Sequence, residues 1–182
     1  MTLTAVVTAH DASPGPIVRN LLAQTRKPDE ILVFISAHKH ALRLTGFDGL
    51  VQVFLVANKN DWGHQKRALG LELASGDFIG WFNHDDSYEP TYIEELLGAV
   101  EREDADVAFC NWSHGGRGMD VNHACEFRGG NSTAGNWIGR TALIREVGYT
   151  NRDYSADAHL IDAVRPKAKV VKVHKTLYNH NP

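Results

Sequence analysis

The sequence has few of the features that mark membrane proteins, disulfide-rich proteins or nucleic-acid-binding proteins. No apolar run approaches the ~18 residues that a membrane-spanning helix needs. The formal net charge is -3, which provides no overall basic field to attract nucleic acid or an anionic membrane. The two cysteines, Cys110 and Cys125, form neither a CxxC motif nor a close Cys/His spacing. We therefore expect no transmembrane segment and no nucleic-acid partner.

Repeats, low-complexity tracts and a targeting segment are also missing. The start, MTLTAVVTAH, has no basic stretch followed by a long apolar one. With so few cysteines, a reduced, cytoplasmic protein is the prediction. The chain of 182 residues is 43% hydrophobic and 23% charged, so it can bury a core of ordinary size within one domain. Ten histidines are more than usual and invite a metal interpretation.

Short apolar strands alternate with amphipathic helices over roughly the first 110 residues, which is typical of α/β proteins. Strands are predicted at 3–8, 30–35, 50–57, 77–82 and 105–112, and helices at 13–24, 65–74 and 91–103. Gly76 is predicted to be the C-terminal glycine cap of the helix that precedes it. The alternation predicts a parallel sheet with right-handed crossovers.

The last third of the chain follows another pattern. Residues 113–133 are rich in glycine, histidine and arginine and show no period, and loops of this length are usually functional or mobile. Short helices are predicted at 140–147 and 155–164, and a closing strand at 168–178. Because no linker separates the two parts, we predict one domain over residues 1–182.

The strand at 77–82 ends at two adjacent carboxylates, Asp85 and Asp86. In an open parallel sheet, ligands bind beyond the carboxyl ends of the strands. Neighbouring carboxylates repel unless water or a divalent cation lies between them, and Mg²⁺ is typically held by one or two carboxylates together with substrate phosphates. The pair therefore favours a metal-bound diphosphate. The plainer alternative is that Asp86 or Ser87 caps the following helix.

Three segments, in this order and at this spacing, resemble family 2 glycosyltransferases of the GT-A fold. They are LLAQTRKPDEILVF at 21–34, NKNDWGHQKRALGLELASGDFIGWF at 58–82 and NHDDSYEP at 83–90. The resemblance implies a GT-A-like α/β domain with a mostly parallel sheet flanked by helices, whose nucleotide-binding half is 1–112 and whose acceptor-side half is 113–182. It also implies a nucleotide diphosphate sugar donor and Mn²⁺ or Mg²⁺. By that match, Asp85 contacts the ribose or the metal, and Asp86 binds the metal on the diphosphate.

The sequence departs from the family pattern at three places. Family members usually carry an aspartate that contacts the base just after the second strand, where this chain has Ile35 and Ser36. Asn83 and His84 stand where acids are common. In YSADAHLIDAV, one acid of the late acidic pair is replaced and Asp157 remains.

The resemblance implies that Asp157 is the general base of an inverting transfer. A carboxylate in that role accepts the proton of a sugar hydroxyl while the hydroxyl oxygen attacks the anomeric carbon. Asp157 lies near a predicted helix start, which favours its charged form, so an electrostatic role at the helix dipole is the plainer alternative. Asp153 and Asp162 are the other candidates for the base.

Further donor contacts are predicted where loops follow the first and third strands. Asp61, His64 and Arg67 surround the start of a helix, where exposed N–H groups favour anions, and we expect them to contact the donor phosphates or base. A solvated helix face is the alternative. His10 and Asp11 follow the first strand, where the family's loop wraps the nucleoside.

A late histidine, His180, is predicted to be a metal ligand. In some GT-A enzymes a histidine near this place completes the metal shell, and a neutral imidazole binds Mn²⁺ more readily than Mg²⁺. The alternative is a residue of a frayed tail.

Acceptor contacts are predicted from Trp112, Asn136 and Trp137, with Trp62 as a further candidate. Aromatic faces suit sugar rings, because the C–H surfaces of those rings are apolar, although core packing is an equal alternative for Trp137. The acceptor carries a hydroxyl group and is a saccharide, a lipid-linked glycan or a protein.

The predicted function is therefore metal-dependent transfer of a sugar from a nucleotide diphosphate sugar to a hydroxyl acceptor, with inversion. A nucleotidyltransferase of the same fold is one alternative. Such enzymes usually carry a glycine-rich basic loop after the first strand, whereas AHDASPGP contains no lysine or arginine. The other alternative is a catalytically inert module that binds nucleotide sugars.

Overall fold

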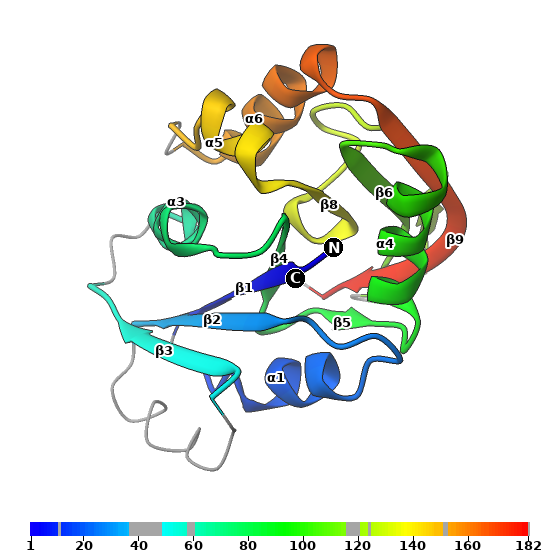
Figure 1. The fold of residues 1–182 in the computed structure, drawn as a ribbon. Helices are drawn as coiled ribbons and strands as arrows, with labels where there is room; N and C mark the ends of the chain where they lie inside the picture. Colours follow the sequence, from blue (N-terminus) through cyan, green and yellow to red (C-terminus); the bar gives the residue numbers. More distant parts are fainter. Residues whose placement is uncertain are drawn as a thin grey trace.

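The computed structural model describes residues 1–10, 12–36, 49–57, 61–115, 121–123, 125–150 and 153–181. It is a single α/β domain built on one curled sheet with helices on both faces (Figure 1). The predicted donor contact Asp11 lies outside the described residues. No described helix is both long and apolar enough to cross a bilayer.

The predicted strands and helices are confirmed to within a few residues at each end. The strands are β1 (Leu3–Ala9), β2 (Glu30–Ile35), β3 (Val51–Leu55), β4 (Phe78–Asn83), β5 (Ser87–Tyr88), β6 (Val107–His114), β7 (Val121–His123), β8 (Trp137–Arg140) and β9 (Val170–His180). The helices are α1 (Gly15–Leu22), α3 (His64–Leu73), α4 (Tyr92–Glu103), α5 (Thr141–Val147) and α6 (Ala156–Val164), with short 3₁₀ turns at Ala134–Asn136 and Arg165–Lys167.

The sheet is mostly parallel rather than wholly so. Its strand order is β3-β2-β1-β4-β8-β6-β9-β5, with β7 paired to β6. β8, which the sequence did not predict, runs antiparallel to both β4 and β6. Two reversals of direction cancel, so β6 runs the same way as β4, and β9 pairs parallel to β6. The carboxyl ends of β1, β4, β6 and β9 therefore lie along one edge of the sheet.

Alternating side chains divide the core into two layers. Along β1, Leu3, Ala5 and Val7 pack with α1 and α4, whereas Val6 packs with α3, α5 and α6. Figure 1 shows α3, α5 and α6 grouped on one side of the sheet and α1 on the other. Because both faces are covered, the central strands read as continuous apolar runs, as parallel strands do.

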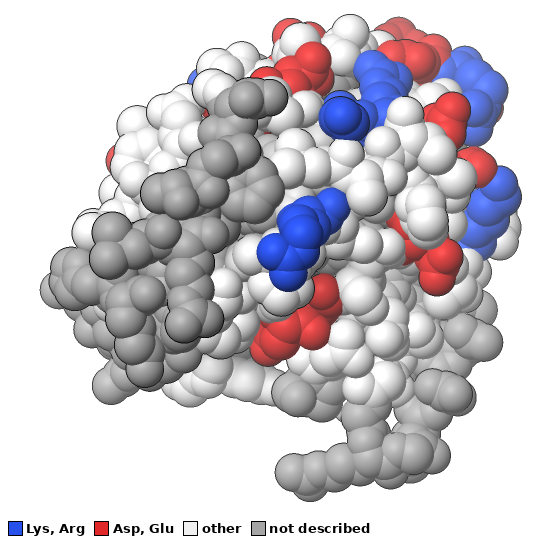
Figure 2. Space-filling view, turned by 90° about the horizontal axis from the view of Figure 1, so that it is seen from below, with Lys and Arg blue, Asp and Glu red and all other residues white. Residues whose placement is uncertain are grey.

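Charges are mixed on the face that Figure 2 presents. In the part of that face which the structure describes, basic and acidic side chains lie interspersed among uncharged ones, without a broad patch of either sign.

The prediction that Gly76 caps α3 is wrong. The helix ends at Leu73, and the next residue, Ala74, already has a non-helical conformation with ψ 130. Gly76 instead lies against the start of β1, where an added Cβ would come within 2.7 Å of the Thr4 backbone nitrogen. A glycine is required here because two backbone segments approach each other closely. From the sequence pattern alone, a glycine with this role cannot be told apart from a glycine that caps a helix.

Gly76→Ala should destabilise the fold by about 1–3 kcal/mol, since the methyl group would collide with backbone atoms that cannot move aside. The midpoint of urea unfolding measures this. Gly49→Ala is the matched control, because an added Cβ at Gly49 meets no atom within 4 Å. Equal midpoints for the two variants would contradict the packing argument.

Candidate active site

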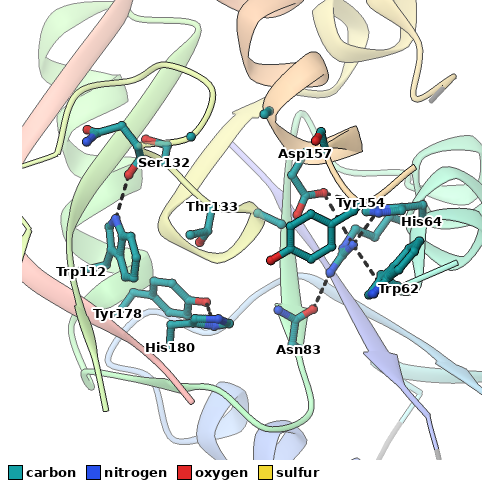
Figure 3. Close-up of a pocket in the computed structure, with 16 residues that line it drawn as sticks. Trp62, His64, Asn83, Trp112, Ser132, Thr133, Tyr154, Asp157, Tyr178 and His180 are labelled. Carbon is teal, nitrogen blue, oxygen red and sulfur yellow. Dashed lines mark hydrogen bonds and ion pairs between the residues drawn. The ribbon is translucent and has the colours of Figure 1, made fainter. Parts of the chain in front are cut away.

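Two adjoining cavities open at the edge where the parallel strands end. The larger has a volume of about 410 Å³ and the smaller about 280 Å³. Trp62, Arg67, Asn83 and His180 line both, so the two adjoin as parts of one cleft. Figure 3 shows the larger of the two. Such a position outside the carboxyl ends of strands is where open α/β sheets bind ligands.

The turn before α3 is held by Asp61. The two carboxylate oxygens of Asp61 accept hydrogen bonds from the backbone N–H groups of Gly63 (3.1 Å) and Gln65 (2.8 Å). Gly63 adopts a left-handed conformation with φ 84, and Trp62 adopts one with φ 52, which is uncommon for a residue other than glycine. Asp61 therefore shapes the turn, and the turn places the exposed Trp62 indole at the cleft.

Arg67 is the buried centre of the cleft. Its guanidinium donates to Asn83 Oδ1 (2.8 Å) and to the backbone oxygen of Trp62 (3.2 Å), and Nη1 lies 3.5 Å from the carboxylate of Asp157. Burial disfavours its charge, but the Asp157 carboxylate and the hydroxyl of Tyr149 more than offset this and raise the pKa of Arg67 above its ordinary value. The charge of Arg67 is therefore permanent.

Asp157 lies at the start of α6 on the wall of the larger cavity, and its side chain is 27% exposed. Its carboxylate accepts a hydrogen bond from the hydroxyl of Tyr149 and lies 3.7 Å from Nδ1 of His64. The alternative candidates for the base are engaged elsewhere. Asp153 accepts from the N–H of Ser155, and Asp162 accepts from the N–H of Gly129.

The acidic pair after β4 is divided between solvent and core. The Asp86 side chain is fully buried and accepts hydrogen bonds from Asn83 Nδ2 (2.8 Å), the Tyr178 hydroxyl (2.8 Å) and the Asn181 backbone (3.1 Å), with His180 Nδ1 also at 3.1 Å. Asp85 is exposed and lines the smaller cavity. The predicted pair therefore acts as two separate groups.

The donor set suits a cation whose shell is completed by a ligand. Among the described residues, no three histidine, cysteine, aspartate or glutamate side chains gather closely enough to hold a metal by themselves. Asp85 and His180 nevertheless line the same cavity. The hydrogen bond to Asp86 occupies Nδ1 of His180, so Nε2 is the ring nitrogen that remains for a ligand. The same bond raises the pKa of this histidine, so binding of a cation there would displace a proton. Histidine ligands of metals commonly have such a carboxylate behind them.

The end of β1 forms the floor of the smaller cavity. Lys66 is buried there, and its ammonium group donates to the backbone oxygen of Ala9 (3.0 Å) and approaches His10 Nδ1 at 3.2 Å. Burial, followed by the positive charge of Lys66, lowers the pKa of His10. His10 is therefore a neutral group at pH 7.

Of the predicted acceptor residues, one lies on the cleft and two lie in the core. Trp112 lines the larger cavity, and its indole N–H donates to the backbone oxygen of Asn131 (3.0 Å). Trp137 is 1% exposed and packs against Trp81 and Phe127. Asn136 is also buried, and its side chain bonds backbone atoms at 110 and 133. The structure places these last two residues in the core rather than on the cleft.

Of the other predicted site residues, His10, Arg67, Asp85 and His180 line the smaller cavity, and His64, Arg67, Asp157 and His180 line the larger. Sequence reasoning did not select Tyr149, Tyr154 and Tyr178. Tyr154 is 78% exposed, and its ring lies edge-to-face with Trp62 at 5.7 Å. An aromatic residue in the polar stretch before α6 was the only local signal for it.

Comparison with known proteins identifies the class of this fold. S. aureus TarS (residues 1–349) superimposes with a TM-score of 0.80 at 16% identity, covering 100% of this chain and 60% of that one. The same TarS fragment in complex with UDP gives 0.82 at 14% identity, and in complex with UDP-GlcNAc 0.80 at 15%, covering 61% and 59% of those chains. This chain thus spans about three fifths of the length of these structures, and it shares their GT-A-like fold.

The profile of glycosyl transferase family 2 matches residues 15–162. This chain therefore belongs to glycosyl transferase family 2, as the resemblance of its sequence motifs predicted. No curated protein sequence matches it.

Asn83→Asp should cost about 1–3 kcal/mol of stability at pH 7, since it replaces the N–H donor to Asp86 with a second carboxylate. Asp86→Asn should cost a similar amount. The double variant reverses donor and acceptor and should recover at least half of the summed loss, as coupled neighbours do. Urea unfolding of the four proteins measures this, and losses that simply add would contradict a direct bond between the two side chains.

Proposed function

We propose that this chain transfers a sugar from a nucleotide diphosphate sugar to a hydroxyl acceptor, with inversion at the anomeric carbon. The observation that carries the proposal is the position of Asp157, which faces the cleft across from His180 and beside Arg67 (Figure 3). A direct displacement needs a base on one side of the sugar and groups that stabilise the departing diphosphate on the other. The UDP and UDP-GlcNAc complexes of TarS support such a donor.

In the proposed reaction, the acceptor hydroxyl gives its proton to Asp157 while its oxygen forms a bond to the anomeric carbon. The bond between that carbon and the diphosphate oxygen breaks, and its electron pair leaves with the diphosphate. Arg67 and the N-terminus of α3 place positive charge near the smaller cavity, where it stabilises this developing negative charge.

Asp85 and His180 would hold a divalent cation in the smaller cavity, with Asp86 orienting the imidazole from behind. When bound, the cation neutralises charge on the leaving diphosphate. A carboxylate together with an imidazole favours Mn²⁺ over Mg²⁺.

The rim of the larger cavity supports a saccharide as the acceptor. The rings of Trp62 and Tyr154 are exposed there beside Asp157. Exposed aromatic faces at the mouth of a cavity suit the apolar C–H faces of sugars. The hydroxyl-bearing residues Thr133 and Ser155 line the same cavity and suit the polar edges of sugars.

Asp157→Asn should lower the rate of sugar transfer about 10²- to 10⁴-fold, because the amide cannot accept the proton. Nucleotide binding should persist, since the smaller cavity is unchanged. Release of nucleoside diphosphate from a panel of donors measures the rate. Asp162→Asn, at an exposed position on the same helix, is the control and should keep the wild-type rate.

A full rate in Asp157→Asn would remove this residue from the reaction. A wild-type protein that binds donors but never cleaves them would favour the inert binding module instead.

UDP at 100 times its dissociation constant, with Mn²⁺ present, should raise the melting temperature by about 5–10 °C. Chelation, or the substitution His180→Ala, should remove most of that shift, because the cation would lose a ligand. Differential scanning fluorimetry measures it, with the exposed His174→Ala on the same strand as the control. A shift that survives both treatments would show that nucleotide binding needs no cation at this site.

A further inference from the structure

Tyr149 stands behind Asp157 on the segment that follows α5. Gly148, with φ 79, ends that helix in a conformation that suits glycine and turns the chain back toward α3. The Tyr149 ring is 6% exposed and packs against Trp81 at 5.9 Å and His64 at 5.8 Å. Its position is thus fixed by packing, and only its hydroxyl hydrogen is free to rotate.

Two acceptors from the described part of the chain lie within reach of that hydroxyl. It donates to Asp157 Oδ1, and His64 Nδ1 lies 2.9 Å from the hydroxyl oxygen of Tyr149. Arg67 Nη1 is 3.1 Å from His64 Nδ1 and 3.5 Å from Asp157 Oδ1. Among the residues that the structure describes, the charged and titratable groups in contact with Asp157 are therefore His64 and Arg67 from α3 and Tyr149 from the chain after α5.

A phenol carries one hydrogen, so it bonds one of these acceptors at a time. Burial, together with the carboxylate of Asp157, raises the pKa of Tyr149 far above its ordinary value, although Arg67 opposes this. The hydroxyl consequently stays protonated and acts as a donor rather than as a base. An ionised carboxylate is a stronger acceptor than a neutral imidazole. While Asp157 is charged, the hydrogen points to it, and His64 Nδ1 accepts from Arg67.

We propose that Tyr149 is a positioning residue that holds the Asp157 carboxylate in place and redirects its hydrogen to His64 when Asp157 takes up a proton. The proposal rests on the role of Asp157 as the base. Protonated Asp157 donates its new O–H to the phenol oxygen, and the phenol hydrogen rotates to His64 Nδ1. No proton leaves the group, and both the Tyr149 hydroxyl and the Asp157 carboxyl keep a hydrogen-bond partner in each state.

Two substitutions should move the acid side of the pH profile of kcat in opposite directions. Tyr149→Phe keeps the packed ring and removes the donor that favours ionised Asp157, so activity should fall at a pH about one unit higher than in the wild type. The rate at its plateau should fall about tenfold, with the donor KM unchanged. His64→Leu removes the acceptor that serves protonated Asp157, so activity should persist to lower pH.

Tyr92→Phe is the control. Tyr92 is equally buried, and its hydroxyl donates to the Gly135 backbone oxygen (2.9 Å) on the other layer of the core. The Tyr92→Phe variant should unfold at a lower urea concentration than the wild type, while the acid side of its pH profile of kcat stays unchanged.

Three outcomes separate the proposals. A wild-type protein with no sugar transfer overturns the function itself. Transfer that requires Asp157 but keeps its acid limb in Tyr149→Phe overturns the role of Tyr149. If Tyr149→Phe does not fold, the sign for His64→Leu decides, and an unchanged limb or a shift to higher pH overturns the proposal.

Discussion

The arrangement of the cleft depends on one buried cation. A guanidinium removed from water is tolerated only when its charge and its N–H groups find partners. The two Nη groups of Arg67 find partners in the backbone of Trp62, just before α3, and on two elements that are distant in sequence, with Asn83 at the end of β4 and Asp157 at the start of α6. Since these contacts compensate the buried charge, Arg67 links the carboxylate at the start of α6 to the end of β4.

Asn83 extends this constraint to the other side of the cleft. Its amide oxygen accepts from Arg67 while its amide nitrogen donates to Asp86, which in turn bonds His180. An ionised aspartate at position 83 would accept from Arg67 but would repel Asp86. The departure from the family's acidic pattern is thus explained by the double role of an amide. It completes a chain of contacts from Asp157 to His180.

Most of the parallel strands could be predicted from the sequence, because strands such as β1 and β4 are continuous apolar runs that are recognisable from local sequence alone. β8 could not be predicted in this way, since its four residues form an antiparallel strand only through pairing with β4 and β6. The same limit applies to the cleft. Asp157 and His180 were found through the family resemblance, whereas Trp137 and Trp112 look alike in sequence and differ only in burial.

The division of Asp85 from Asp86 shows how adjacent residues of one type take different roles. The chain turns directly after β4, so one carboxylate faces solvent and the next faces the core. The buried one cannot remain there alone, and four groups around it satisfy its lone pairs. One of these is an imidazole on β9, which Asp86 orients toward the cleft. Asp86 thus bonds His180 and does not line the cleft, an arrangement that a resemblance of motifs does not show because it aligns residues without their neighbours.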